Sequence, residues 1–277
     1  VVPYDTMLTA GKYYLQRMRK STGIPVGDIL ETAVQSMGLR DVVEFDIDKK
    51  VIGIPKQDGP LVNQNVVDFV DEVSRDTPAP GGGSISALAG ALAASLASMI
   101  ANLSVGKGEF DEQYETLCDL AEQAQRLKDD LLQAVDADTE AFNAVLEAMR
   151  MPKDTPEQKG VRAAALSEGY KAAARVPLRT AELCNDTLKL CLRAAQIGNE
   201  AVISDAGVGA LMAFAGLQGA IYNVRINLPQ TEDASFVAEM RKKLEALLSE
   251  AKKTCDAVQR EVEKSLNHLP GDQGQEN

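Results

Sequence analysis

Residues 78–104 read "PAPGGGSISALAGALAASLASMIANLS", three glycines followed by a long alanine-rich run without a charged residue. The run from Ile85 to Leu103 is long enough for a buried helix or for a membrane span. Three serines and Asn102 interrupt it, and it has neither an aromatic belt nor a cationic flank. We therefore expect a close-packed central helix and no membrane span.

Small residues recur at every third or fourth position of this run, so one face of the helix lets another backbone approach closely. Residues 204–223, "SDAGVGALMAFAGLQGAIYN", repeat the pattern. We expect these two helices to pack together, within one chain or across a dimer.

Helical periodicity continues through most of the chain after residue 65. It predicts helices over 66–73, 84–103, 110–149, 156–196, 204–228 and 235–267. Pro177 is expected to kink its helix or to begin a new one. Long helices with short connections indicate an all-α fold, an up-and-down helical bundle.

The first 54 residues differ from the rest of the chain. They predict helices over 6–20 and 26–37 and a strand over 51–54 that has no evident partner. The sequence is therefore divided into a small α/β domain at 1–54, a linker at 55–65, a helical domain at 66–269 and a disordered tail at 270–277.

Composition excludes several kinds of partner and site. A formal net charge of -12 over 277 residues argues against nucleic acid, which requires clustered Lys and Arg. The four cysteines are widely spaced, so they indicate neither zinc nor disulfides but reduced, packed thiols in a cytoplasmic protein. The one histidine, His268, lies in a polar tail. Catalysis would therefore use carboxylates, Lys, Tyr, Cys or backbone groups, without a metal site.

Asp138 is the strongest anomaly in the sequence. On a helix its neighbours are all apolar: Leu131, Ala134, Val135, Ala141, Phe142 and Val145. A carboxylate on such a face is costly to bury, and desolvation would raise its pKa toward the range that is useful for proton transfer. From this pattern alone, Asp138 could be a buried structural residue that ties helices together, or it could be a functional acid. Asp136 and Glu140 are assigned to the polar side of the same helix.

Gly81, Gly82 and Gly83 precede a helix but have neither the spacing nor the lysine of a nucleotide-binding loop. They could form a tight turn, or their backbone N–H groups could converge on a ligand. Ser84 is expected to cap the helix that follows.

A second polar cluster lies near the other small-residue helix. Asp205 falls in its first turn, where the helix dipole favours an acid. Asn223 and Asn227 are one turn apart at its end, and they could recognise a heterocycle or bridge two helices.

Four segments together carry a family resemblance. They are residues 77–104, the segment "VDADTEAFNAVLEAMRMPKDTPEQK", the segment "EGYKAAARVPLRTAEL" and residues 198–228, and in this order they resemble the formiminotetrahydrofolate cyclodeaminase family. Residues 1–54 are similar to the end of a glutamate formimidoyltransferase, so the strand is expected to belong to a sheet upstream, and the chain to be a fragment of a fused enzyme. This sequence has no counterpart of the transferase's amino-terminal subdomain or of its catalytic histidine, so we expect no transferase activity from this chain.

The resemblance implies a helical bundle that forms dimers, or higher homo-oligomers, with sites at the subunit interface. It also implies a reaction in histidine degradation and one-carbon metabolism: 5-formimidoyltetrahydrofolate closes to 5,10-methenyltetrahydrofolate and releases ammonia. Folate, with one or more glutamates, is then a substrate, and no prosthetic group is needed.

Site roles follow from the resemblance as well. Asp138 matches the family's essential acid, a general acid and base. Gly81, Gly82, Gly83 and Ser84 match its glycine-rich loop and are expected to contact the substrate, at the pterin or at the formimino group. Asp205, Asn223 and Asn227 are assigned to pterin recognition or to orienting Asp138, and Lys107 to the glutamate tail. Two alternatives are a methenyltetrahydrofolate cyclohydrolase of the same bundle type and a non-catalytic helical oligomerisation module.

Overall fold

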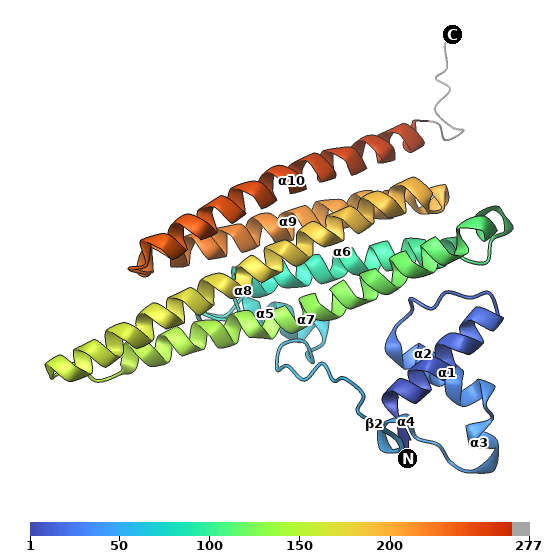
Figure 1. Cartoon of the computed structure of the whole chain (residues 1–277), viewed down its shortest axis with the longest axis horizontal. Coiled ribbons are helices and arrows are strands. Elements are labelled where there is room, and N and C mark those ends of the chain that lie inside the picture. The colour runs from blue at the N-terminus through green and yellow to red at the C-terminus, as the bar shows by residue number, and fades with distance from the viewer. Residues whose placement is uncertain (268–277) are drawn as a thin grey trace, which may run out of the picture.

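The computed structural model describes residues 1–267, so His268 and the predicted disordered tail lie outside the described residues. Five long helices run up and down side by side and form the bundle, and a small N-terminal unit lies beside one end of it (Figure 1). The prediction of an all-α bundle is confirmed.

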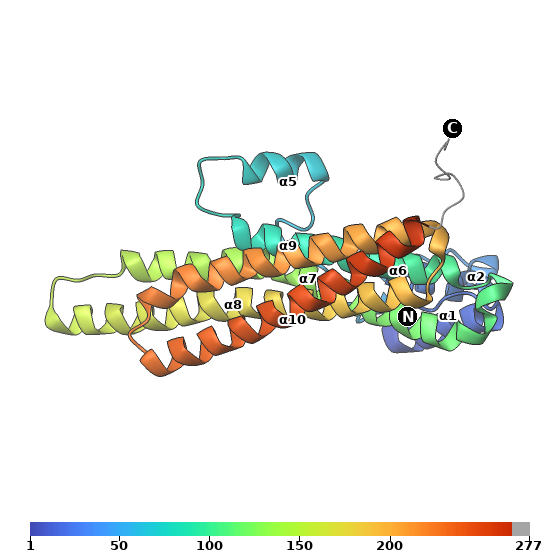
Figure 2. The same cartoon turned by 90° about the horizontal axis from the view of Figure 1, so that it is seen from above.

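The bundle helices are α6 (Gly82–Ser104), α7 (Tyr114–Arg150), α8 (Pro156–Ile197), α9 (Ile203–Asn227) and α10 (Ala234–Leu266). Short 3-10 turns at Gly108–Gln113, Glu200–Val202 and Leu228–Gln230 lie in their connections. α7 and α8 form an antiparallel hairpin that extends beyond α6 and α9 (Figure 1). The short helix α5 (Val66–Val73) stands off one side of the bundle (Figure 2).

α8 continues for 42 residues through Pro177, so of the two expected outcomes, a kink or a new helix, the second is wrong. A proline inside a helix cannot donate to the carbonyl four residues before it, here that of Ala173. The side-chain amide of Asn227 in α9 donates to the Ala173 oxygen at 2.9 Å instead. A side chain of the neighbouring helix therefore satisfies the carbonyl that the proline leaves free.

The two small-residue helices pack together within one chain, as one of the two expected arrangements requires. A Cβ added at Gly216 of α9 would lie 2.7 Å from the Ser86 oxygen of α6, so the two backbones are nearly in contact. A Cβ at Gly90 would lie 2.6 Å from the Cys184 sulfur of α8. Glycine is required at both positions because no side chain fits between these helices.

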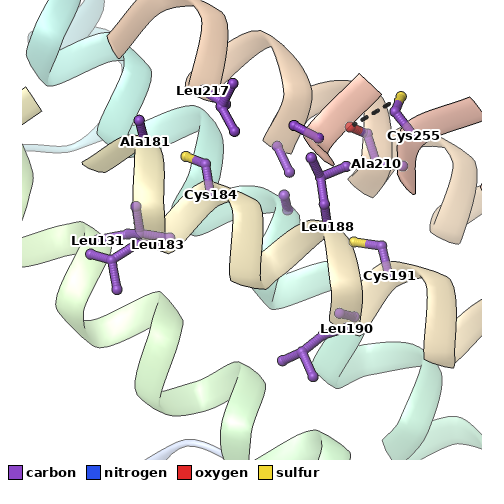
Figure 3. Packing of buried hydrophobic residues seen from close by; sticks show 14 of the residues in the cluster. Leu131, Ala181, Leu183, Cys184, Leu188, Leu190, Cys191, Ala210, Leu217 and Cys255 are labelled. Carbon is purple, nitrogen blue, oxygen red and sulfur yellow. Dashed lines mark hydrogen bonds between the residues drawn. The ribbon is translucent and has the colours of Figure 1, made fainter. Parts of the chain in front are cut away.

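The four cysteines are free and buried, as predicted. Figure 3 shows Cys184, Cys191 and Cys255 among the leucines and alanines of the core. Burial raises the pKa of Cys184 and of Cys191 to about 12. These thiols therefore pack as small apolar side chains and do not ionise near neutral pH.

The N-terminal unit contains β1 (Val2–Pro3), α1 (Tyr4–Arg17), α2 (Val26–Ser36), α3 (Leu39–Val42), α4 (Ile47–Lys50) and β2 (Val51–Ile52). β2 pairs in parallel with β1, so the expectation of a strand without a partner in this chain is wrong. The partner was missed because a two-residue strand that contains a proline has no alternating pattern to detect.

The N-terminal unit is fixed to the bundle by the loop after α1. The Gly23 oxygen accepts hydrogen bonds from Ser98 Oγ at 3.0 Å and from Asn102 Nδ2 at 3.1 Å. Lys12 also forms a 2.7 Å ion pair with Glu122 of α7. Two of the polar residues that interrupt the apolar run of α6 therefore hold the neighbouring unit.

Residues 53–65 form neither helix nor strand, yet they are not a free tether. Asp136 of α7 is buried, and its carboxylate accepts the backbone N–H groups of Leu61 at 2.8 Å and of Val62 at 3.2 Å. The assignment of Asp136 to the polar side of its helix is therefore wrong. The connecting segment covers that side and supplies the partners that an ionised carboxylate needs.

Candidate active site

A pocket of about 380 Å³ opens where α6 begins, between α7, α8 and α9. Its lining includes Pro78, Gly81, Gly82, Asp138, Phe142, Tyr170, Ala173, Asn223, Ile226 and Asn227. Segments that are far apart in the sequence thus meet at one end of α6. The volume lies in the range of small-molecule sites.

Asp138 projects from α7 onto the N-terminus of α6. A Cβ added at Gly83 would lie between 2.0 and 2.3 Å from the three terminal atoms of the Asp138 carboxylate, so this carboxylate rests directly on the glycine backbone. The backbone N–H of Ser84 donates a hydrogen bond to it. Desolvation raises the pKa of Asp138, and the Ser84 bond offsets part of that rise. The geometry thus provides a partly exposed acid whose pKa is shifted toward neutrality.

The glycine-rich loop divides into a lining part and a buried part. Gly81 and Gly82 line the pocket, whereas Gly83 and Ser84 are buried beneath it. Ser84 does not cap α6, because Gly81 is the N-cap residue and the Ser84 hydroxyl donates to the Val135 oxygen at 2.7 Å. The expected substrate contact of Ser84 is therefore replaced by a positioning role, since its side chain fixes α6 to α7.

Asn223 and Asn227 line the pocket from α9 with their amide groups held in place. Asn223 Nδ2 donates to the Gly219 oxygen at 2.9 Å. Asn227 Nδ2 donates to the oxygens of Ala173 and Asn223, at 2.9 and 2.8 Å. Within residues 1–267 neither Oδ1 atom has a hydrogen-bond partner, so both are available to accept from a ligand.

The structure does not bring Asp205 or Lys107 to this pocket within one chain. Asp205 lies in the first turn of α9, 18 residues before Asn223, which corresponds to about 27 Å along the helix. Lys107 is exposed beyond the C-terminus of α6, at the end of that helix opposite to Gly82. α6 and α9 are antiparallel, so both residues fall at the far end of the bundle.

Phe142 and Tyr170 are pocket residues that had no site role in the sequence analysis. Phe142 lies one turn after Asp138 and was noted only as an apolar neighbour. Tyr170 occurs in the segment "EGYKAAARVPLRTAEL", which supported the resemblance without a role for this residue. The scarcity of aromatics, six tyrosines, six phenylalanines and no tryptophan, was a signal that could have drawn attention to both.

The polar lining of the pocket combines three acceptor groups with the amide of Gln230 and the hydroxyl of Tyr170, which can donate or accept. Asp138 provides a carboxylate, and Asn223 and Asn227 provide amide oxygens. No Lys, Arg or His side chain of the described residues lines it. Such a pocket suits a ligand that carries N–H donors or positive charge at the end that enters.

Comparison with known proteins places this architecture in a family. Residues 65–246 match the model of the Formiminotransferase-cyclodeaminase family, and residues 1–55 match the Formiminotransferase domain. The crystal structure of formiminotetrahydrofolate cyclodeaminase from Thermotoga maritima superposes with a TM-score of 0.67 at 25% identity, covering 74% of this chain and 98% of that chain.

Two curated relatives represent two activities. The methenyltetrahydrofolate cyclohydrolase of Methylorubrum extorquens is 38% identical over 205 residues, which are 74% of this chain and 99% of the relative. The formimidoyltransferase-cyclodeaminase of Mus musculus is 35% identical over 256 residues, 91% of this chain and 47% of the relative. The chain thus spans about half the length of that bifunctional relative. The resemblance is confirmed, and the chain belongs to the formiminotransferase-cyclodeaminase family, whose members process folates.

Proposed function

We propose that this chain is a formimidoyltetrahydrofolate cyclodeaminase, which converts 5-formimidoyltetrahydrofolate to 5,10-methenyltetrahydrofolate and ammonia. One observation carries the choice of reaction. The match to the bifunctional relatives extends through the N-terminal unit, whereas the match to the cyclohydrolase covers only 74% of the chain. A formiminotransferase segment in the same chain supports a substrate that carries a formimidoyl group.

Asp138 is the general acid and base of the proposed reaction. N10 of the folate attacks the amidinium carbon on N5, and the new C–N10 bond gives a tetrahedral aminal. The Asp138 carboxylate takes the proton from N10 and delivers it to the former amidine nitrogen. The C–N bond to that nitrogen then breaks, ammonia leaves, and the positive charge remains on the methenyl bridge.

The raised pKa of Asp138 supports this role, because an acid–base group works best when its pKa is close to the working pH. No oxidation state changes in the reaction, so it requires no redox cofactor. The amide oxygens of Asn223 and Asn227 are suited to accept hydrogen bonds from the amidinium N–H groups.

Cyclohydrolysis is the second candidate, and the 38% identity to a cyclohydrolase favours it. Its substrate is a methenyl cation without N–H donors on the reacting carbon, and the attacking water would then be the donor to the free amide oxygens. Ammonia release from 5-formimidoyltetrahydrofolate separates the two. Wild-type protein that hydrolyses methenyltetrahydrofolate but releases no ammonia from the formimidoyl substrate would contradict the proposal.

The active form we propose is a homodimer, in which α6 and α9 contact a second copy. These two helices carry large apolar side chains that are 38 to 72% exposed: Ile85, Leu92, Leu103, Val208, Leu211, Tyr222 and Ile226. α6 and the segment Glu200–Gln230 are also long and apolar enough to cross a membrane, by length and composition alone. Within one chain 61% of the apolar stretch of α6 is buried, but only 39% of that of Glu200–Gln230. A second copy is the occupant we propose for the apolar face that is left exposed.

An antiparallel dimer of this kind would place Asp205 of the partner subunit and Lys107 of the partner subunit beside the pocket. This arrangement would give both residues the site role that the single chain does not. Mixing two inactive variants, Asp138→Asn and Asp205→Asn, tests it, because a shared site regains activity in mixed dimers. A monomer by light scattering, or no recovery on mixing, would contradict the arrangement.

The remaining partners follow from the same proposal. The substrate is a reduced folate with one or more glutamates, and the protein acts in the cytoplasm without nucleic acid or a membrane span. Thermal-shift titration with folinate distinguishes this enzyme from a helical oligomerisation module, because a ligand that binds only the native state raises the Tm.

A further inference from the structure

Phe142 and Tyr170 are two aromatic side chains that core packing does not account for. Both are partly exposed and both line the pocket. Neither belongs to the hydrophobic clusters of the described residues, whereas Phe110 and Phe236 pack on the main core. The Tyr170 hydroxyl also has no hydrogen-bond partner within residues 1–267. Two rings are thus exposed to the pocket without a structural partner.

The two rings come from different walls. Phe142 belongs to α7 and Tyr170 to α8, the two arms of the antiparallel hairpin (Figure 1). The arms approach closely beside the pocket, where a Cβ added at Gly169 would lie 3.3 Å from Val145 Cγ2. The Phe142 and Tyr170 rings nevertheless make no ring contact with each other, while Tyr13 and Tyr14 do so at 5.4 Å in the described chain. Neither ring therefore stacks on the other, and both belong to the lining of the same pocket.

We propose that Phe142 and Tyr170 form an aromatic clamp that holds the flat pyrimidinone ring of a pterin-class ligand. The inference rests on the proposed function and specifies how its substrate is held. Aromatic faces bind a planar ring by stacking, while edge groups decide which ring is accepted. In the proposed reaction Asp138, one turn before Phe142, and the oxygens of Asn223 and Asn227 serve the formimidoyl end of the substrate, so the two rings are left to hold its pterin.

The clamp also has a consequence for the chemistry. Asp138 and Phe142 are four residues apart on one helix, so they lie on the same face, one turn from each other. A ring that stacks on Phe142 is therefore held at a fixed height above the carboxylate. Removing a ring should weaken binding and also lower kcat, because the reacting atoms lose their alignment.

The test measures the binding of folinate to the full chain by calorimetry, for wild type and for Phe142→Leu, Tyr170→Leu and Tyr170→Phe. Phe110→Leu is the matched control, since Phe110 is also partly buried but packs on the core at the far end of α6. Each leucine variant at the clamp should raise the Kd by roughly 5- to 150-fold, the effect of removing a ring that stacks on a base. Tyr170→Phe should bind within about threefold of wild type because it keeps the ring.

The outcomes separate the clamp from the proposed function. If wild type binds folinate and both leucine variants bind equally well, the clamp is wrong and the proposed function stands. If Tyr170→Phe loses as much affinity as Tyr170→Leu, the hydroxyl carries the contact and stacking is again wrong. If wild type itself does not bind folinate, both proposals fail. Thermal unfolding of each variant verifies that it is folded.

Discussion

Replacing Gly83 by alanine should disable the enzyme while leaving its fold intact. The added Cβ would lie 2.0 Å from Asp138 Oδ1, 2.2 Å from Cγ and 2.3 Å from Oδ2. An ordinary carbon–oxygen contact is about 3.3 Å, so the carboxylate must withdraw by about 1 Å or more. It is the end of a side chain, so rotation about its bonds relieves the clash. Ser84 N–H then loses its acceptor, and Asp138 leaves the position from which it reaches the substrate.

The two effects have different sizes. A displacement of about 1 Å can reduce kcat about 100-fold. Stability should fall by no more than about 2 kcal/mol, because the Ser84 N–H that loses its acceptor costs about 1–3 kcal/mol and alanine in a helix is favoured over glycine by about 0.5–1 kcal/mol. The assay follows the absorbance of methenyltetrahydrofolate and the release of ammonia, with Tm measured on the same samples.

Gly160→Ala is the matched control for this experiment. Gly160 lies in the first turns of α8, and a Cβ there meets nothing within 4 Å. This variant should keep full activity with the same gain in helix stability. A folded Gly83→Ala protein that retains wild-type kcat would refute the assignment of Asp138.

Four further predictions test other parts of the structure. Asp136→Asn should cost about 1–3 kcal/mol of stability, because the N–H of Leu61 or of Val62 loses its acceptor, yet kcat should change little; denaturation measures the first and enzyme kinetics the second. Asn227→Leu should cost a similar amount of stability, because the Ala173 oxygen loses its hydrogen-bond donor. Adding Pro177→Ala should recover part of this loss, because alanine has the N–H that proline lacks. Additive losses in a double-mutant cycle would contradict this explanation. Gly216→Ala should cost about 1–3 kcal/mol in urea unfolding because it separates α6 from α9. Burial raises the pKa of Asp138, so the folded state favours the protonated carboxyl. The Tm of wild type should therefore fall relative to that of Asp138→Asn as the pH rises above the ordinary aspartate pKa. A wild-type Tm that rises relative to the variant would show instead that the folded state stabilises the ionised carboxylate.

The helices could be predicted from the sequence because their signals are local. α7 and α10 show a strong apolar periodicity, and Thr155 with Gln158 forms the capping box that begins α8. The strand partner of β2 could not be predicted, because a two-residue pairing depends on tertiary contacts rather than on a pattern.

The site could be predicted only in part, for the same reason. Asp138 was detectable as a charge on an apolar face, which needs nothing beyond helix geometry. The burial of Asp136 depends on Leu61 and Val62, which lie more than 70 residues away in a segment without regular structure. The separation of Asp205 from Asn223, by contrast, follows from the rise of the single helix predicted over 204–228 and was available from the sequence. The place of Lys107 at the same far end depends on the antiparallel arrangement of α6 and α9, which no local pattern encodes.

The most direct test of the central claim is the rate of ammonia release from 5-formimidoyltetrahydrofolate by wild type and by Asp138→Asn. We expect ammonia and methenyltetrahydrofolate in equal amounts from wild type, and a rate at least about 100-fold lower from the variant, because a general acid–base group contributes roughly 10²–10⁴-fold. The variant should still bind folinate and should unfold at the same Tm or a higher one. A folded Asp138→Asn protein that releases ammonia at the wild-type rate would contradict the claim.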